Sequence, residues 1–448
     1  MGVTWKTVSR SSLGWRTGIS SVDQALLSAM GFLISILLIR TVSKEEYGYY
    51  SIAVPVSLLL VSLQNGIVNA PLTVLLASKK GAERREYVSS LCFGQFLVVL
   101  PAVGAGLIAF AIFRIPGLGA TVNAIAAALC ASAGSLLYRE FLRSYLFAEE
   151  DSLAVLRMDA LYVVLSVCGL FILYLYSGIR IDTVFLLLGA SALLASLPFG
   201  RGRGWSFPPR SVSKSYRENW KFGKWALLGV CVTHAQSYSC LYLLGILSGS
   251  VAVADMSAAR LLLMPVMLIQ VGWGRIAIPH GSRLRECGQN RLFFMQQVRT
   301  SILVLLCITL YVILLMLFSD LLRVFLFSDK YADSLRYVLA WGVICAMGFL
   351  AVNAGYGLQV MMKFDVITKW SFMVMLVTVG CSYFFIRAYG IAGGFAAMIL
   401  GETLAAIVLW YCFAMSVFPG GRDAEPKKTE DDSTMKLAEK DAVVRLDD

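Results

Sequence analysis

The sequence predicts an all-α integral membrane protein with about twelve transmembrane helices. Of its 448 residues, 58% are hydrophobic and only 15% are charged, which is too little charge to cover a soluble protein of this size. Apolar runs of about 20 residues recur from Ile19 to Ser416, and each is long enough to cross ~30 Å of hydrocarbon. A soluble enzyme with an apolar core is therefore disfavoured.

The predicted spans follow one another with short connections. They cover residues 19–39, 47–77, 88–113, 121–147, 152–176, 183–199, 225–247, 255–278, 298–319, 335–360, 367–387 and 391–416. The first is not expected to be a cleaved signal, since it is long, no A-x-A site follows and the chain runs straight into the second span.

The distribution of lysine and arginine predicts that both termini are cytoplasmic. With the N-terminus inside, 29 of the 39 basic residues fall in inside segments and 9 in outside segments, as the positive-inside rule requires. The net charge of +11 then indicates topology and contact with anionic membrane lipids. Nucleic-acid binding is not expected, because no basic soluble domain is present. Nine of the ten cysteines fall inside spans, so no disulfide framework is implied.

A basic segment at residues 200–224 divides the spans six and six. Similar landmarks recur in both halves: Pro55 and Pro71 match Pro265 and Pro279 at offsets of 210 and 208. This suggests a duplicated unit. We therefore predict two pseudo-symmetric six-helix bundles around a central cavity. The first covers residues 1–199 and the second 225–418, with 200–224 as a cytoplasmic linker loop and 419–448 as a disordered cytoplasmic tail.

Motifs for nucleotide or metal chemistry are absent from the sequence. There is no G-x-x-x-x-G-K-[ST] and no H-E-x-x-H, and the only histidines are His234 and His280. The outside loops are short, so a large extracytoplasmic catalytic domain has no place. No cofactor, metal site or enzymatic activity is expected, although an intramembrane enzyme or assembly factor of polysaccharide synthesis stays open as an alternative.

Intramembrane polar side chains are the functional candidates, because they are costly to bury in lipid. They concentrate in spans one, two, seven and eight, which we expect to face each other across a wet cavity. The cavity candidates for substrate binding are Gln64, Asn65, Asn69, His234, Gln236, Arg260, Gln270 and Arg275. The candidates for gating or ion coupling are Asp23, Arg139, Asp159 and Glu402.

Each candidate also has a plainer interpretation. Arg260 and Arg275 lie 15 residues apart, on one face of a continuous helix, but each is close enough to a predicted span end to reach headgroups. Arg139 and Arg143 share a face at the cytoplasmic boundary, where headgroup contact is favoured. The amides of span two could bond neighbouring helices, and Glu402 is either a satisfied buried acid or a proton-coupling acid.

Three stretches resemble a known family. "SKEEYG" (43–48), "DMSAARLLLMPVMLIQVGWGRIAIP" (255–279) and "LFSDKYADS" (326–334) are similar to the first turn, the eighth helix and an outside turn of Wzx-type flippases. These belong to the multidrug/oligosaccharidyl-lipid/polysaccharide exporter superfamily. The resemblance spans residues 15–416, but His234 matches no family residue.

The resemblance implies two bundles forming a V, which work by alternating access in a bacterial inner membrane. The implied substrate is a polyprenyl-diphosphate-linked oligosaccharide, moved from the inner to the outer leaflet for surface polysaccharide synthesis. Polysaccharide polymerase or export machinery would be further partners. The alternative is an ion-coupled multidrug or organic-cation antiporter of the same fold.

Two roles follow for the charged candidates. Arg260 and Arg275 could replace the hydration of a diphosphate, while amides and Tyr238 bind the glycan. Asp23 is expected at the cytoplasmic mouth, paired with Arg139 or Arg275 in one access state. Its alternative role is to stabilise a helix N-terminus through the dipole.

Overall fold

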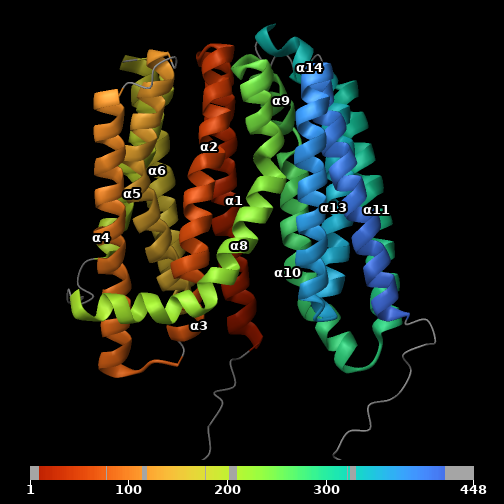
Figure 1. Ribbon diagram of the computed structural model, residues 1–448, viewed down its shortest axis with the longest axis horizontal. Helices are drawn as coiled ribbons and strands as arrows, with labels where there is room; N and C mark the ends of the chain where they lie inside the picture. The colour runs from red at the N-terminus through yellow and green to blue at the C-terminus, as the bar shows by residue number, and fades with distance from the viewer. Residues whose placement is uncertain are drawn as a thin grey trace, which may run out of the picture.

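The computed structural model describes residues 10–76, 78–113, 119–176, 178–200, 209–319, 321–322 and 329–418. Within these ranges the chain is helical and holds no strand. The helices stand side by side in two halves (Figure 1). The first half contains α1 (Arg10–Thr41), α2 (Lys44–Gln64), the π-helix η1 (Asn65–Asn69), α3 (Ala70–Leu76), α4 (Gly81–Phe113), α5 (Ala120–Ala148), α6 (Ser152–Tyr176) and α7 (Ile181–Gly200). The second contains α8 (Pro209–Ser248), α9 (Ser250–Leu261), α10 (Met264–Glu286), α11 (Asn290–Leu317), the 3-10 helix η2 (Asp329–Tyr337), α13 (Val338–Val360) and α14 (Phe364–Val417).

The helices account for the predicted membrane spans. Within the described ranges, nine helices are long and apolar enough to cross a membrane, or ten if α9 and α10 form one broken span. In addition, α4 contains the predicted span 88–113, and α14 contains the last two spans. These two spans are separated at Gly390, whose φ of 57° is a left-handed conformation that glycine adopts without steric cost. The all-α membrane fold is confirmed; the predicted tail, 419–448, lies outside the described residues.

The "SKEEYG" stretch fixes where α2 begins. The Ser43 side chain accepts a hydrogen bond from the Glu46 backbone N–H at 3.2 Å, and the Glu46 carboxylate accepts one from the Ser43 N–H at 3.0 Å. This reciprocal capping box satisfies two backbone donors that a helix start leaves unpaired. Tyr47, on the first turn that follows, is 3% exposed. The end of the molecule that holds this turn is called the Ser43 end below, and the opposite end, where α14 stops, the Val417 end.

The eighth predicted span is not continuous, contrary to the sequence prediction. The chain bends by 60° between α9 and α10, at Leu262 and Leu263, just before Pro265. Proline lacks an N–H and clashes with the carbonyl four residues earlier, which here belongs to Leu261. The shared face inferred for Arg260 and Arg275 required a straight helix, so the bend removes that argument.

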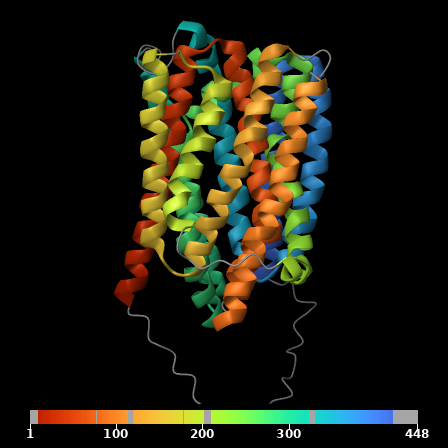
Figure 2. The same cartoon turned by 90° about the vertical axis from the view of Figure 1, so that its left-hand side faces the viewer.

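The predicted linker loop is also helical from Pro209 onward, because α8 begins there. This first part of α8 lies across the first half near the Val417 end before the helix turns toward the Ser43 end (Figures 1 and 2). Ser215, Asn219 and Gly223, four residues apart, form a buried strip that packs against α4 and η1. The side-chain oxygen Oδ1 of Asn219 accepts a hydrogen bond from the Tyr87 hydroxyl at 2.6 Å. The polar composition of this segment predicted a loop, because the sequence does not show that the neighbouring bundle buries one side of it.

Asn219 should therefore contribute to stability. Replacing Asn219 by leucine removes the partner of the Tyr87 hydroxyl and is expected to cost about 1–3 kcal/mol. Thermal unfolding of the purified protein in detergent measures the loss. Lys221→Ala, on the exposed side of the same helix, is the control and should leave the midpoint unchanged. Equal midpoints for both variants would contradict the assigned role.

Candidate functional site

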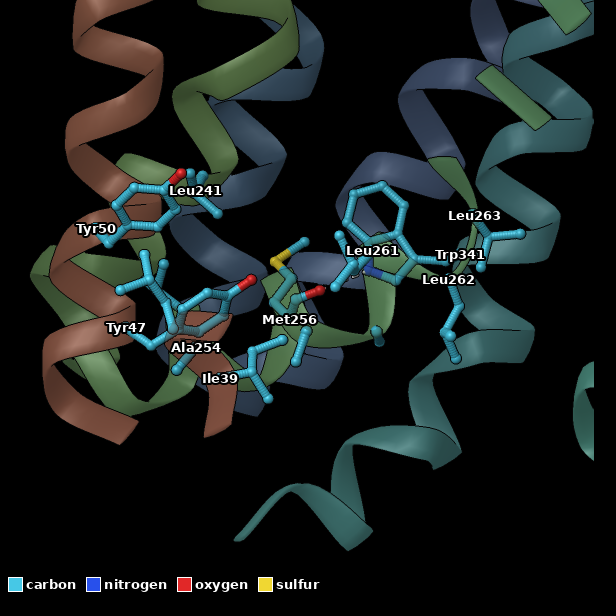
Figure 3. Close-up of a cluster of buried hydrophobic side chains, with 14 of the residues drawn as sticks. Ile39, Tyr47, Tyr50, Leu241, Ala254, Met256, Leu261, Leu262, Leu263 and Trp341 are labelled. Carbon is cyan, nitrogen blue, oxygen red and sulfur yellow. Dashed lines mark hydrogen bonds between the residues drawn. The ribbon is translucent and has the colours of Figure 1, made fainter. Parts of the chain in front are cut away.

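The two halves meet closely at the Ser43 end, where α2 packs along α9. Tyr47 and Tyr50 of α2 lie against Leu241 of α8 and against Ala254 and Met256 of α9 (Figure 3). These side chains are at most 8% exposed. We call this apolar contact, together with the polar contacts beside it, the junction.

The polar part of the junction joins segments far apart in the sequence. The Lys44 ammonium lies 2.6 Å from the Asp255 carboxylate, which also accepts from the Ser334 hydroxyl at 2.5 Å. The Lys330 ammonium donates to the Val42 carbonyl at 3.0 Å. Between the halves Gly48 faces the Ser250 backbone so closely that a Cβ atom would overlap its carbonyl group. The junction thus closes the space between the halves at the Ser43 end.

A cavity of 560 Å³ lies inside the second half. This volume falls within the range of about 300–1,000 Å³ typical of ligand pockets. The wall runs from Arg260 toward the Val417 end, where Gln359 and Trp370 lie on the last turn of α13 and the first turns of α14. Its polar and aromatic lining residues are Thr233, Gln236, Ser237, Arg260, Gln270, Trp341, Tyr356, Gln359, Trp370, Ser371 and Glu402.

Among the residues that the structure describes, Arg260 and Glu402 are the charged ones on this wall. Because α9 begins at Ser250, Arg260 lies ten residues into the helix, or ~15 Å from its start. It is deeper than the sequence predicted and is poorly placed to reach headgroups. Its guanidinium group lies 5.6 Å from the Trp341 ring centre and 5.8 Å from that of Tyr238, within cation–π range.

The cavity brings together several of the predicted site residues. Arg260, Gln236, Gln270 and Glu402 come from four helices and line the same wall. Arg275 does not line it and is exposed, because it lies five residues beyond Gln270, or ~140° around the same helix, and Gln270 is the one that faces the cavity. The predicted pair of cations is therefore separated.

The other substrate-binding candidates lie outside this cavity. His234 is bonded to the Tyr242 hydroxyl at 3.0 Å, and its ring contacts that of Tyr238. Gln64 donates to the Leu137 carbonyl at 2.9 Å, which matches the helix-bonding alternative. In η1, Asn65 is exposed and Asn69 is buried.

Buried charges also gather in the first half, away from the cavity. Asp159 of α6 accepts from Arg139 at 2.5 Å and from Arg143 at 2.8 Å, both on α5. Arg143 also donates to Asp23 of α1 at 2.6 Å. Asp23, Asp159 and Arg139 are at most 7% exposed. We call these four residues the ionic network; it ties α1, α5 and α6 together.

The ionic network corrects two sequence predictions. Arg139 and Arg143 bond carboxylates inside the bundle, where headgroup contact had been favoured. Asp23 does pair with an arginine, but its partner is Arg143 instead of Arg139 or Arg275. Because Asp23 and Arg143 belong to the same half, movement of one half against the other does not break their pair. The structure gives no support to Asp23 as a gate between access states.

Sequence reasoning missed the aromatic part of the cavity and the charged part of the junction. Trp341, Trp370 and Tyr356 read as ordinary residues of apolar spans, and nothing local marks them as cavity-lining. Lys44 and Asp255 lie within the stretches that carry the family resemblance, so those stretches were the available signal. Their pairing joins residues more than 200 positions apart and needs the tertiary structure.

Comparisons with known proteins agree with this architecture. A family model described as "Polysaccharide biosynthesis protein" matches residues 16–285. The structure is similar to the inward-facing conformation of a multidrug resistance MATE family transporter of the MOP superfamily (15% identity, 88% of this chain and 94% of that chain, TM-score 0.69). It is also similar to lipid II flippase MurJ in an inward closed conformation (14% identity, 88% of this chain and 86% of that chain, TM-score 0.70). An outward-facing MATE family transporter of the MOP superfamily gives a TM-score of 0.61 (16% identity, 91% of this chain and 95% of that chain). No curated protein matches the chain in sequence.

Proposed function

We propose, from the premise that this chain belongs to the polysaccharide biosynthesis protein family, that it moves a polyprenyl-diphosphate-linked oligosaccharide from the inner to the outer leaflet of a bacterial inner membrane. The observation that carries this proposal is a cavity in the second half that combines a deep cation, amides and aromatic rings, beside a junction that closes the Ser43 end. The MurJ likeness supports a lipid-linked substrate.

Alternating access would then consist of opening the Ser43 end and closing the Val417 end. The basic residues favour a cytoplasmic Val417 end, so this structure corresponds to an inward-facing state; the higher TM-score against the inward-facing transporter than against the outward-facing one supports that assignment. Opening of the junction would give the cavity access to the other side. An inside-negative potential of 100 mV favours outward movement of each negative charge by ~2.3 kcal/mol, so a diphosphate substrate requires no nucleotide hydrolysis.

The two arginines that the sequence grouped together provide the test. Arg260→Ala is expected to slow transbilayer movement of a labelled polyprenyl-diphosphate oligosaccharide at least 10-fold in liposomes, since a charge-assisted hydrogen bond contributes about 1.5–3 kcal/mol. Arg275→Ala is the matched control, because Arg275 is exposed and off the cavity wall; its rate should stay within about 2-fold of wild type. Absence of movement in the wild type would refute the flippase.

A second candidate function is the multidrug or organic-cation antiporter. The observation in its favour is Glu402, a carboxylate on the cavity wall that could bind a cationic substrate. Proton-dependent efflux of a cationic dye from the same liposomes, abolished by Glu402→Gln and without movement of the glycolipid, would establish this function instead.

A further inference from the structure

Within the described ranges, the wall of the cavity in the second half contains one basic residue, Arg260, and one acidic residue, Glu402. Its lining residues in those ranges include no other Lys, Arg, His, Asp or Glu. Among the described residues, neither Arg260 nor Glu402 forms an ion pair. Both are half-buried, and charged groups held away from bulk water are normally paired, so these two are available to a ligand that offers both hydrogen-bond donors and acceptors.

Glu402 is placed to bind a ligand. It projects from α14 toward α13, where the absence of a side chain at Gly348 leaves room beside it: a Cβ added at Gly348 would lie 3.4 Å from Glu402 Oε2. An ionised carboxylate accepts hydrogen bonds through two oxygens. In that ionised form it would also repel a diphosphate, whose two negative charges a single arginine does not balance in any case.

The rest of the wall suits an uncharged, hydroxylated ring. Trp370 is 36% exposed and lines the cavity near the Val417 end, together with Tyr356. Gln236, Gln270 and Gln359 add amides that both donate and accept. A sugar ring combines an apolar face of C–H bonds with equatorial hydroxyls, which matches aromatic surfaces interspersed with polar groups.

We propose that this cavity is a sugar-binding chamber: it takes the glycan of the substrate, while the diphosphate stays outside it, nearer the lipid. Glu402 accepts from sugar hydroxyls, Arg260 donates to sugar oxygens, and Trp370 stacks on a ring. This inference rests on the proposed function and changes the role of Arg260, which the sequence assigned to the diphosphate.

Thiol protection tests the chamber directly. Ser371 lines the cavity, and Ser371→Cys places a thiol in it; the exposed cysteines are first replaced by serine, namely Cys168, Cys231, Cys287 and Cys307. Alkylation at position 371 is followed by mass spectrometry in the full-length protein. The probes are inorganic diphosphate and the oligosaccharide released by mild acid from lipid-linked intermediates of the producing cells.

We expect the released oligosaccharide to slow alkylation at least 10-fold and diphosphate to leave it within 2-fold. Trp370→Ala and Glu402→Gln should each abolish protection at an unchanged unfolding midpoint. Trp220→Ala, which removes an exposed tryptophan of α8 outside the cavity, should retain it. Protection by diphosphate, or none by the oligosaccharide, would overturn the proposal. Protection by the oligosaccharide and by diphosphate is measured without transport, so failure of the flippase assay would count against the proposed function alone.

Discussion

Replacing Asp159 by alanine is expected to lower the free energy of unfolding by about 3–5 kcal/mol, the largest stability loss that we predict for a single substitution. Asp159 is fully buried and is shared by Arg139 and Arg143. Its removal leaves Arg139 without its carboxylate and Arg143 with Asp23 and a longer contact to Glu140, 3.5 Å away. Thermal and denaturant unfolding of the purified protein in detergent measures the effect.

An exposed ion pair provides the control for this prediction. Arg180 and Asp182 are joined at 3.0 Å at the start of α7, where solvent screens the charges, so Asp182→Ala should leave the unfolding midpoint unchanged. If Asp159→Ala had no larger effect than Asp182→Ala, the ionic network would not hold the first half together. Asp23→Asn offers a separate test: loss of transport with unchanged stability would restore a gating role for Asp23.

Substituting Gly48 by alanine is expected to reduce transport at least 10-fold while the protein stays folded. Its Cβ would overlap the Ser250 carbonyl across the junction, and backbone atoms cannot move aside as a flexible side chain can. The halves would then be held apart at the Ser43 end, and the state seen here would become unfavourable. The liposome assay for the lipid-linked oligosaccharide gives the rate.

Gly31→Ala is a matched control in the same half, because nothing lies within 4 Å of a Cβ built at that position. A second readout is the labelling rate of a Lys44→Cys thiol by a membrane-impermeant reagent. That rate should rise in the Gly48→Ala background if the junction opens. Wild-type transport by Gly48→Ala would show that the close approach of Gly48 and Ser250 has no part in the transport cycle.

How much the sequence could predict differs between the fold and the site. The membrane class, the approximate positions of the spans and the break between the last two spans, at residues 388–390, were all predicted correctly. They depend on the length of apolar runs and on the conformational preferences of single residues, which are local properties. The capping box of Ser43 and Glu46 is local in the same sense. Among the site candidates, Arg260, Gln236, Gln270 and Glu402 were selected because polar groups are costly to bury in lipid, and the structure places all four on one cavity wall.

The partners of the charged residues could not be predicted. The sequence predicted that Arg143 contacts headgroups, because only its position near the end of a span could be judged. Its actual hydrogen bonds depend on how α5 is rotated against α1 and α6. Arg275 is not on the wall with Arg260, because the bend at Leu262 and Leu263 breaks their common helix face and α10 presents Gln270, on its other side, to the cavity. The first part of α8 is buried by a neighbouring bundle that its own composition cannot reveal. By itself the sequence determined a helical membrane protein, since transfer to lipid depends on the hydropathy of each segment. Only the tertiary structure decided which of the described charges form ion pairs and which line the cavity without one. That outcome depends on helix rotations and on contacts between segments far apart in the chain.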